Sequence, residues 1–153
     1  MSRLTRILLR KLTLSPLAVR AYDRIFPVTT LGQRGERAAE RLLLSQGMVV
    51  IARGYQDKFG EIDLIAIDDQ TLVFVEVKTR TSDAGGQPAE AVDEKKQLHL
   101  TRTAKGYLKW NRLTQVKTRF DVIGILWPCK SESPRIKHYI NAFEPVGKFQ
   151  LMG

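Results

Sequence analysis

The segment that most constrains the fold is residues 60–80, GEIDLIAIDDQTLVFVEVKTR. Two largely apolar runs flank Asp69 and Gln70, a pattern that predicts a β-hairpin with a two-residue loop. In this register Asp68 pairs with Thr71. A hairpin with strands this apolar has to be covered by other elements, so we expect a layered domain around it.

The same register places four charged residues on one face of the hairpin, because strand side chains alternate between faces. These residues are Glu61, Asp63, Glu76 and Lys78. The opposite face is wholly apolar and comprises Ile62, Leu64, Ala66, Val73, Val75 and Val77. A shift of one residue in the pairing would break up this arrangement, because it would move one strand's charges to the other face.

Asp63 and Glu76 stand directly opposite each other in this register, and like charges in such positions destabilise a sheet. One interpretation is that a hard divalent cation such as Mg²⁺ lies between the two carboxylates, with Lys78 close enough to hold a phosphate or orient a water. The other is a solvated face, on which Glu61 and Lys78 form a surface ion pair. The residues alone leave both interpretations open.

The remaining pattern predicts the element order α-β-β-β-α-β-β and therefore a mixed α/β sandwich, a central sheet with flanking helices. The predicted helices cover 31–47 and 90–110, and the predicted strands outside the hairpin cover 48–53, 118–127 and 135–143. We divide the chain into a basic N-terminal arm (1–30), a folded domain (31–145) and a C-terminal tail (146–153).

Composition fits one soluble domain of 153 residues, 43% hydrophobic and 27% charged. Cys129 is the only cysteine, which excludes a disulfide framework and a thiolate zinc site and favours the reducing cytoplasm. His99 and His138 lack metal-ligand spacing, so we expect ordinary surface or core histidines. No apolar run is long enough for a membrane span or a signal-peptide core.

The formal net charge of +9 is uneven, because residues 1–30 hold six basic residues and only Asp23 as an acid. A basic excess favours polyanionic partners, either nucleic acid or an anionic membrane. We expect the arm to be poorly ordered. The next alternative is that the arm contacts phosphates. Its apolar stripe with flanking arginines also overlaps with membrane-surface helices and transit peptides.

Asp63 together with Glu76-Val77-Lys78 matches the D…(D/E)xK signature of the restriction-endonuclease-like, or PD-(D/E)xK, nuclease superfamily. More closely, the chain resembles the YraN-like uncharacterised protein family, which is thought to be nuclease-related. The matching segments occur in the family's order between residues 32 and 143: GQRGERAAERLL, GEIDLIA, LVFVEVKTR, PAEAV, KQLHL, YL, RFDVIGI and INAF. Residues 1–30 lie outside the resemblance.

The resemblance implies a restriction-endonuclease-like sandwich in which Asp63 and Glu76 bind Mg²⁺ or Mn²⁺ and Lys78 is catalytic. It adds Glu36 as a further acidic ligand, although an acid in the first turns of a helix is also ordinary. Glu61 would be a partner to Lys78. Asp121 matches the family's RFDV segment and is as well explained by a structural hydrogen bond as by a role in the site.

The expected activity is metal-dependent endonucleolytic cleavage, with structure-selective DNA rather than RNA as the substrate. Phosphates would be held by cations on the two helices, unless these only form solvated faces: Lys96, Lys95, Arg34, Arg37, Arg102 and Lys105. The sequence shows no platform for stacking bases and no groove-reading helix. Two other functions stay open: an inert nucleic-acid-binding module of the same fold, and a membrane-surface or protein-interaction adaptor. A homodimer also stays open.

Overall fold

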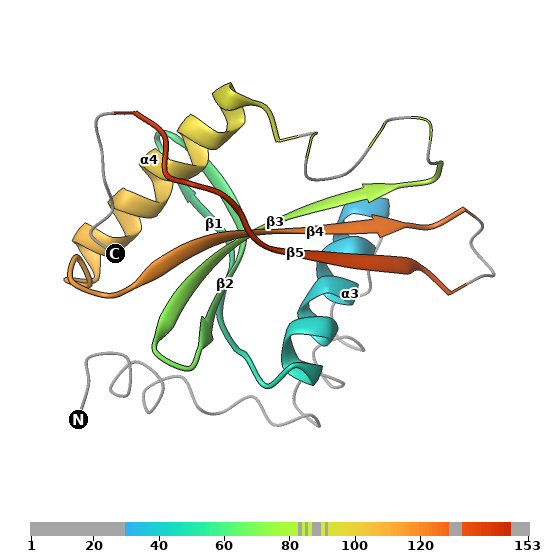
Figure 1. Cartoon of the computed structure of the whole chain (residues 1–153), viewed down its shortest axis with the longest axis horizontal. Coiled ribbons are helices and arrows are strands. Elements are labelled where there is room, and N and C mark those ends of the chain that lie inside the picture. Colours follow the sequence, from blue (N-terminus) through green and yellow to red (C-terminus); the bar gives the residue numbers. More distant parts are fainter. Residues whose placement is uncertain are drawn as a thin grey trace.

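The computed structural model describes residues 30–82, 84, 86, 90, 92–128 and 133–147. Residues 1–29 of the predicted arm, Cys129 and the tail from 148 onward lie outside the described residues. The elements are α3 (Leu31–Ser45), β1 (Val49–Asp57), β2 (Gly60–Asp68), β3 (Thr71–Arg80), α4 (Glu94–Trp110), β4 (Thr118–Leu126) and β5 (Arg135–Phe143) (Figure 1). This is the predicted order, and the predicted α/β class is confirmed.

The five strands form one mixed sheet in the order β1-β2-β3-β4-β5. Only β3 and β4 run parallel, and they are joined through α4, as a parallel pair requires a long crossover. The other neighbouring pairs are antiparallel. The crossover puts the carboxyl ends of β3 and β4 side by side.

Both helices start at side-chain caps that the sequence supplies. Thr30 and Gln33 form a reciprocal capping box at the start of α3. The Asp93 carboxylate accepts the Lys96 backbone N–H at the start of α4. The second cap fixes Lys96 in the first turn of α4.

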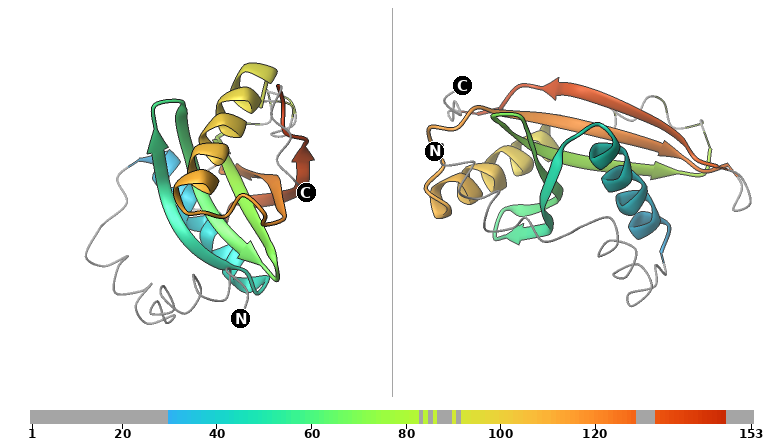
Figure 2. Two further views of the ribbon diagram at one scale, coloured as in Figure 1. Left: turned by 90° about the vertical axis from the view of Figure 1, so that its left-hand side faces the viewer. Right: turned by 90° about the horizontal axis from the view of Figure 1, so that it is seen from below.

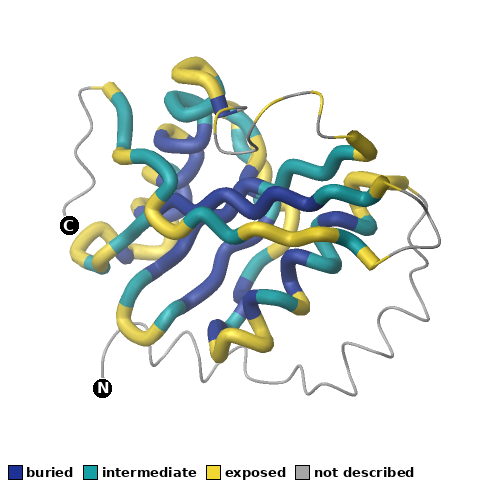
Figure 3. Tube along the Cα trace, turned by 45° about the vertical axis from the view of Figure 1, so that its right-hand side comes forward, coloured by how far each residue is buried: buried dark blue, intermediate teal, exposed yellow. Residues whose placement is uncertain are grey.

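The sheet is buried on both faces, because alternate residues of the central strands pack under different helices. Leu72 and Phe74 join Leu100 and Tyr107 of α4 in one cluster, the α4-side cluster. A second cluster, the α3-side cluster, packs under the other helix; it comprises Ala39, Leu43, Met48, Val50, Leu64, Ala66, Val73, Val75, Ile123 and Ile125. Figure 2 shows the two helices toward opposite ends of the strands, and Figure 3 shows the buried central strands beside the more exposed β5.

One residue departs from the predicted apolar face. Ile62 packs in the α4-side cluster, whereas Leu64 packs in the α3-side cluster, so regular alternation is interrupted between them. The interruption lies where β2 leaves β3 and stays paired only with β1, opposite Tyr55. A strand held by one neighbour is free to twist more strongly.

The contact between α3 and β3 is unusually close at one point. A Cβ atom added to Gly35 would lie 1.7 Å from the Thr79 Oγ1 atom. No side chain larger than hydrogen fits there without moving the helix or the strand. Glycine therefore sets how near α3 approaches the sheet, and with it the position of Glu36.

The hairpin register is confirmed from Asp68–Thr71 to Leu64–Val75, but the predicted pairs Asp63–Glu76 and Glu61–Lys78 do not form. The ladder ends at the Leu64–Val75 pair, just before Asp63 and Glu76. Beyond this point β2 follows β1 toward α4 while β3 continues beside β4 (Figure 1). We call the opening between the two strands the β2–β3 fork.

Candidate metal and nucleic-acid site

Asp63 and Glu76 lie at the β2–β3 fork, where strand pairing no longer satisfies every backbone group. The Asp63 Oδ2 atom accepts the Val77 backbone N–H at 2.7 Å. The Asp63 carboxylate therefore reaches from β2 to β3 and accepts a backbone N–H that has no partner on β2 in the β2–β3 ladder.

Glu76 is almost fully buried, with 4% of its side chain exposed. Its Oε1 atom lies 2.9 Å from the Lys78 Nζ atom and 3.1 Å from the Lys96 Nζ atom. Its Oε2 atom is buried without any hydrogen-bond partner. An orphaned carboxylate oxygen is costly in a protein interior, so this atom calls for a ligand.

The surroundings of the fork raise the pKa values of two acids, Asp63 and Glu36. Burial, followed by the charge of Glu76, raises the pKa of Asp63 to about 7, against the opposing effect of the Val77 hydrogen bond. Burial also raises the pKa of Glu36, and the charges of Glu61 and Glu76 add to that effect. Glu36 on α3 thus lies within electrostatic reach of the two strand carboxylates.

The two lysines reach Glu76 from different elements, Lys78 from β3 and Lys96 from the first turn of α4. The sequence predicts Lys96 as a phosphate contact, and in this structure its ammonium lies on Glu76. Lys78 likewise pairs with Glu76, and Glu61 is exposed and accepts a hydrogen bond from the Gln56 amide at 3.2 Å. The expected Glu61–Lys78 pairing is therefore replaced by two lysines on one carboxylate.

The other predicted phosphate contacts are spread over α3 and α4. The Arg34 guanidinium lies over the Trp127 ring, 4.1 Å from its centroid. Arg37 is half-buried on α3. The remaining three predicted contacts are exposed along α4: Lys95, Arg102 and Lys105.

The chemistry of the fork suits a hard divalent cation. Oxygen is the ligand atom that Mg²⁺ and Mn²⁺ prefer, and one or two carboxylates are a usual protein contribution to a Mg²⁺ site. The unpartnered Glu76 oxygen and the high pKa of Asp63 are both relieved by added positive charge. As the side chains stand, however, no three Asp, Glu, His or Cys residues of the described chain form a ready metal-binding group. The predicted trio of Asp63, Glu76 and Glu36 would have to draw together, and an ion would compete with two lysines for one Glu76 oxygen and with the Val77 N–H for one Asp63 oxygen.

Asp121 has a structural part in the fold. It is fully buried and accepts hydrogen bonds from Arg119, His138 and the Asn141 backbone N–H. Burial alone would raise the pKa of Asp121, but the bonds from His138, Arg119 and Asn141 together lower it. The Asn141 bond closes the irregularity between β4 and β5, so of the two sequence interpretations the structural one accounts for every contact of this carboxylate.

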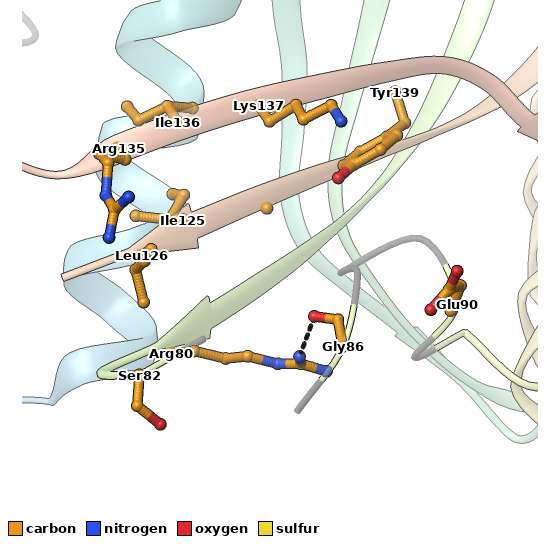
Figure 4. Close-up of a pocket in the computed structure, with 11 residues that line it drawn as sticks. Arg80, Ser82, Gly86, Glu90, Ile125, Leu126, Arg135, Ile136, Lys137 and Tyr139 are labelled. Atoms are coloured by element: carbon orange, nitrogen blue, oxygen red, sulfur yellow. Dashed lines mark hydrogen bonds between the residues drawn. The ribbon is translucent and has the colours of Figure 1, made fainter. Parts of the chain in front are cut away.

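A feature that the sequence did not reveal is a cavity of about 470 Å³ at the carboxyl ends of β3 and β4. Figure 4 shows its basic side chains, Arg80, Arg135 and Lys137, together with Tyr139 and Glu90. The Arg80 Nη1 atom donates to the Gly86 carbonyl at 2.8 Å, which anchors that guanidinium at the cavity wall. The alternation of basic and bulky residues in RIKHYI was the available signal, but its meaning depends on which strand lies next to β4.

The fold and fork together define an α/β domain in which a buried glutamate carboxylate, paired with two lysines, lies beside a partly buried aspartate. None of the described helices is long and apolar enough to cross a membrane. Residues 35–125 match the model of uncharacterised protein family UPF0102, and the chain belongs to this family.

Relatives of the same family cover most of the chain. A UPF0102 protein from Rhodopirellula baltica is 48% identical over 126 residues, which is 80% of this chain and 75% of the relative. One from Caldanaerobacter subterraneus subsp. tengcongensis is 41% identical over 115 residues, 74% of this chain and 94% of the relative. One from Clostridium acetobutylicum is 40% identical over 113 residues, 74% and 93% respectively. The family part of the sequence resemblance is thereby confirmed at the level of UPF0102.

Proposed function

We propose that the protein is a metal-dependent endonuclease of the restriction-endonuclease-like superfamily, acting on structured DNA in the cytoplasm. The observation that carries the proposal is the buried Glu76 carboxylate, which has one oxygen unpartnered and the other shared by two lysines. Asp63 stands beside it with a pKa of about 7. Buried acids with perturbed pKa values beside cations are typical of catalytic sites.

Each residue has a distinct part in the proposed hydrolysis. Asp63 and Glu76 would hold Mg²⁺ or Mn²⁺, with Glu36 as a third acid. The ion would polarise the phosphoryl oxygen and lower the pKa of a bound water. Lys78 stabilises the negative charge that develops on the phosphorane. The Lys96 ammonium can pair with Glu76 or with a substrate phosphate, and it can therefore hold the substrate beside the site.

Cleavage is tested with linear duplex, flap and four-way-junction DNA in the presence of Mg²⁺ or Mn²⁺. We expect Glu76→Gln and Lys78→Ala to abolish cleavage, and Glu94→Gln, an exposed acid on the first turn of α4, to cut like the wild type. DNA affinity should survive in Lys78→Ala, because one phosphate contact among several carries little of the binding free energy. Cutting by Glu76→Gln at the wild-type rate would trace the activity to a contaminant and leave an inert DNA-binding module.

A further inference from the structure

The cavity shown in Figure 4 is related to the β2–β3 fork by the pairing of β3, β4 and β5. Directly paired residues on neighbouring strands share a sheet face, so each β3 residue of the fork heads a row that crosses β4 to β5. Glu76 heads a row that passes Val122 and ends at Tyr139. Glu76 and Tyr139 therefore stand on one face, on strands that are two strand spacings or roughly 10 Å apart.

The next row contains an opening between two cations. Lys78 pairs with Gly124, and Gly124 pairs with Lys137. The row therefore has a lysine on each outer strand. Between them lies only backbone, because Gly124 has no side chain. The third row, headed by Arg80, ends at Arg135.

The chemistry of these rows suits a strand of nucleic acid with exposed bases. Among the described residues that line the cavity, three cations face one acid, Glu90, a balance that attracts phosphates. An aromatic ring in the wall offers a surface on which an unpaired base stacks, irrespective of its identity. The Lys137 Nζ atom lies 4.7 Å from the Tyr139 ring centroid. One nucleotide could therefore contact the ring with its base and the ammonium with its phosphate. A cavity of about 470 Å³ admits a nucleotide but excludes a double helix.

We propose that this cavity binds an unpaired nucleotide of the substrate, so that the enzyme engages DNA at a single-stranded segment next to the fork. The inference rests on the proposed function for the choice of DNA as ligand. It narrows structured DNA to substrates with an unpaired segment, such as a flap, a gap or a frayed junction arm. Tyr139 stacks on the base, and Lys137, Arg135 and Arg80 hold the flanking phosphates.

The test measures binding by fluorescence anisotropy in EDTA, where cleavage cannot interfere. The probes are a labelled single strand of about 12 thymidines and a blunt duplex of similar length. We expect Tyr139→Leu to weaken single-strand binding about tenfold, with Tyr139→Phe close to wild type. Lys137→Ala should flatten the dependence of log affinity on log salt by about 0.7 for the single strand. Lys117→Ala, an exposed lysine just before the other end of β4, is the matched control and should leave both unchanged.

A second readout locates the base directly and does not depend on a loss of affinity. A single 5-iodouracil in the unpaired segment of a flap substrate should photocrosslink to the peptide that contains Tyr139, and blunt duplex should compete poorly. The inference is overturned if Lys137→Ala and Lys117→Ala bind the single strand alike and no crosslink reaches β5. Cleavage that still depends on Glu76 would then leave the nuclease proposal standing. Conversely, a crosslink at Tyr139 in a protein that cuts nothing would support the binding site and refute the nuclease.

Discussion

Replacing Asp63 by asparagine should stabilise the metal-free protein, and the gain should grow with pH. The folded protein holds the Asp63 proton up to about pH 7, whereas the unfolded chain releases it near the ordinary value of 3.8. Unfolding in this interval therefore releases a proton, so stability falls as the pH rises from about 4 to about 7 and then levels off. At 1.36 kcal/mol per pKa unit the whole loss is at most about 4 kcal/mol. Asparagine carries no charge to desolvate, and its amide oxygen can still accept the Val77 N–H.

Thermal unfolding in EDTA between pH 4 and pH 8 measures this effect. We expect Asp63→Asn to be about 2–4 kcal/mol more stable than the wild type at pH 8, which is roughly 5–15 °C in Tm, and nearly equal to it at pH 4. Asp69→Asn removes a charge from the exposed hairpin turn and serves as the matched control. Mn²⁺ at pH 8 should raise the Tm of the wild type but not that of Asp63→Asn. A Tm difference that is the same at every pH, or equal to that of the control, would show that Asp63 is an ordinary solvated acid.

Three further predictions concern other contacts. Lys96→Ala should tighten Mn²⁺ binding about fivefold by calorimetry, because one of the two ammonium groups that compete for Glu76 is gone; weaker binding would show that the lysine does not oppose the ion. Gly35→Ala should cost about 3 kcal/mol in urea unfolding because the added methyl has no room, whereas Gly32→Ala on the same helix meets no atom within 4 Å and should cost nothing. Asp121→Asn should cost about 3 kcal/mol at neutral pH, and the difference from wild type should shrink below about pH 4, because the lowered pKa of Asp121 stabilises the fold only while the carboxylate is charged. A difference for this variant that does not change with pH would contradict the assigned hydrogen bonds.

The hairpin could be predicted from the sequence because its register depends on local information. Strict alternation and a two-residue turn leave one pairing that buries an apolar face, and the observed ladder from Asp68–Thr71 to Leu64–Val75 follows it. The same local reasoning failed at Ile62. There the strand is held from one side only, and its twist depends on partners far along the chain.

The site was harder to predict than the fold, because its contacts join elements that are distant in sequence. Nothing in the helix pattern of 90–110 tells that Lys96 reaches Glu76, since that contact requires the crossover to place the helix start at the fork. The cavity is a stronger case. Tyr139 and Lys137 lie on the same face as Glu76 only because β3 and β4 are parallel and β5 returns beside β4. Side-chain alternation gives the face within a strand, but the order of strands is a property of the whole domain.

The Asp63–Val77 hydrogen bond makes one backbone amide a natural reporter on the site. The Val77 N–H donates to the same carboxylate that the proposed ion would draw toward Glu76, at a distance of 2.7 Å in the present arrangement. A carboxyl acceptor this close deshields the amide proton and retards its exchange with solvent. Any change in the protonation, position or ligation of Asp63 should therefore shift the amide resonance of Val77. The measurement needs no label or substitution at the site. Titrations with protons, cations and DNA can be followed at that single amide in the wild-type chain.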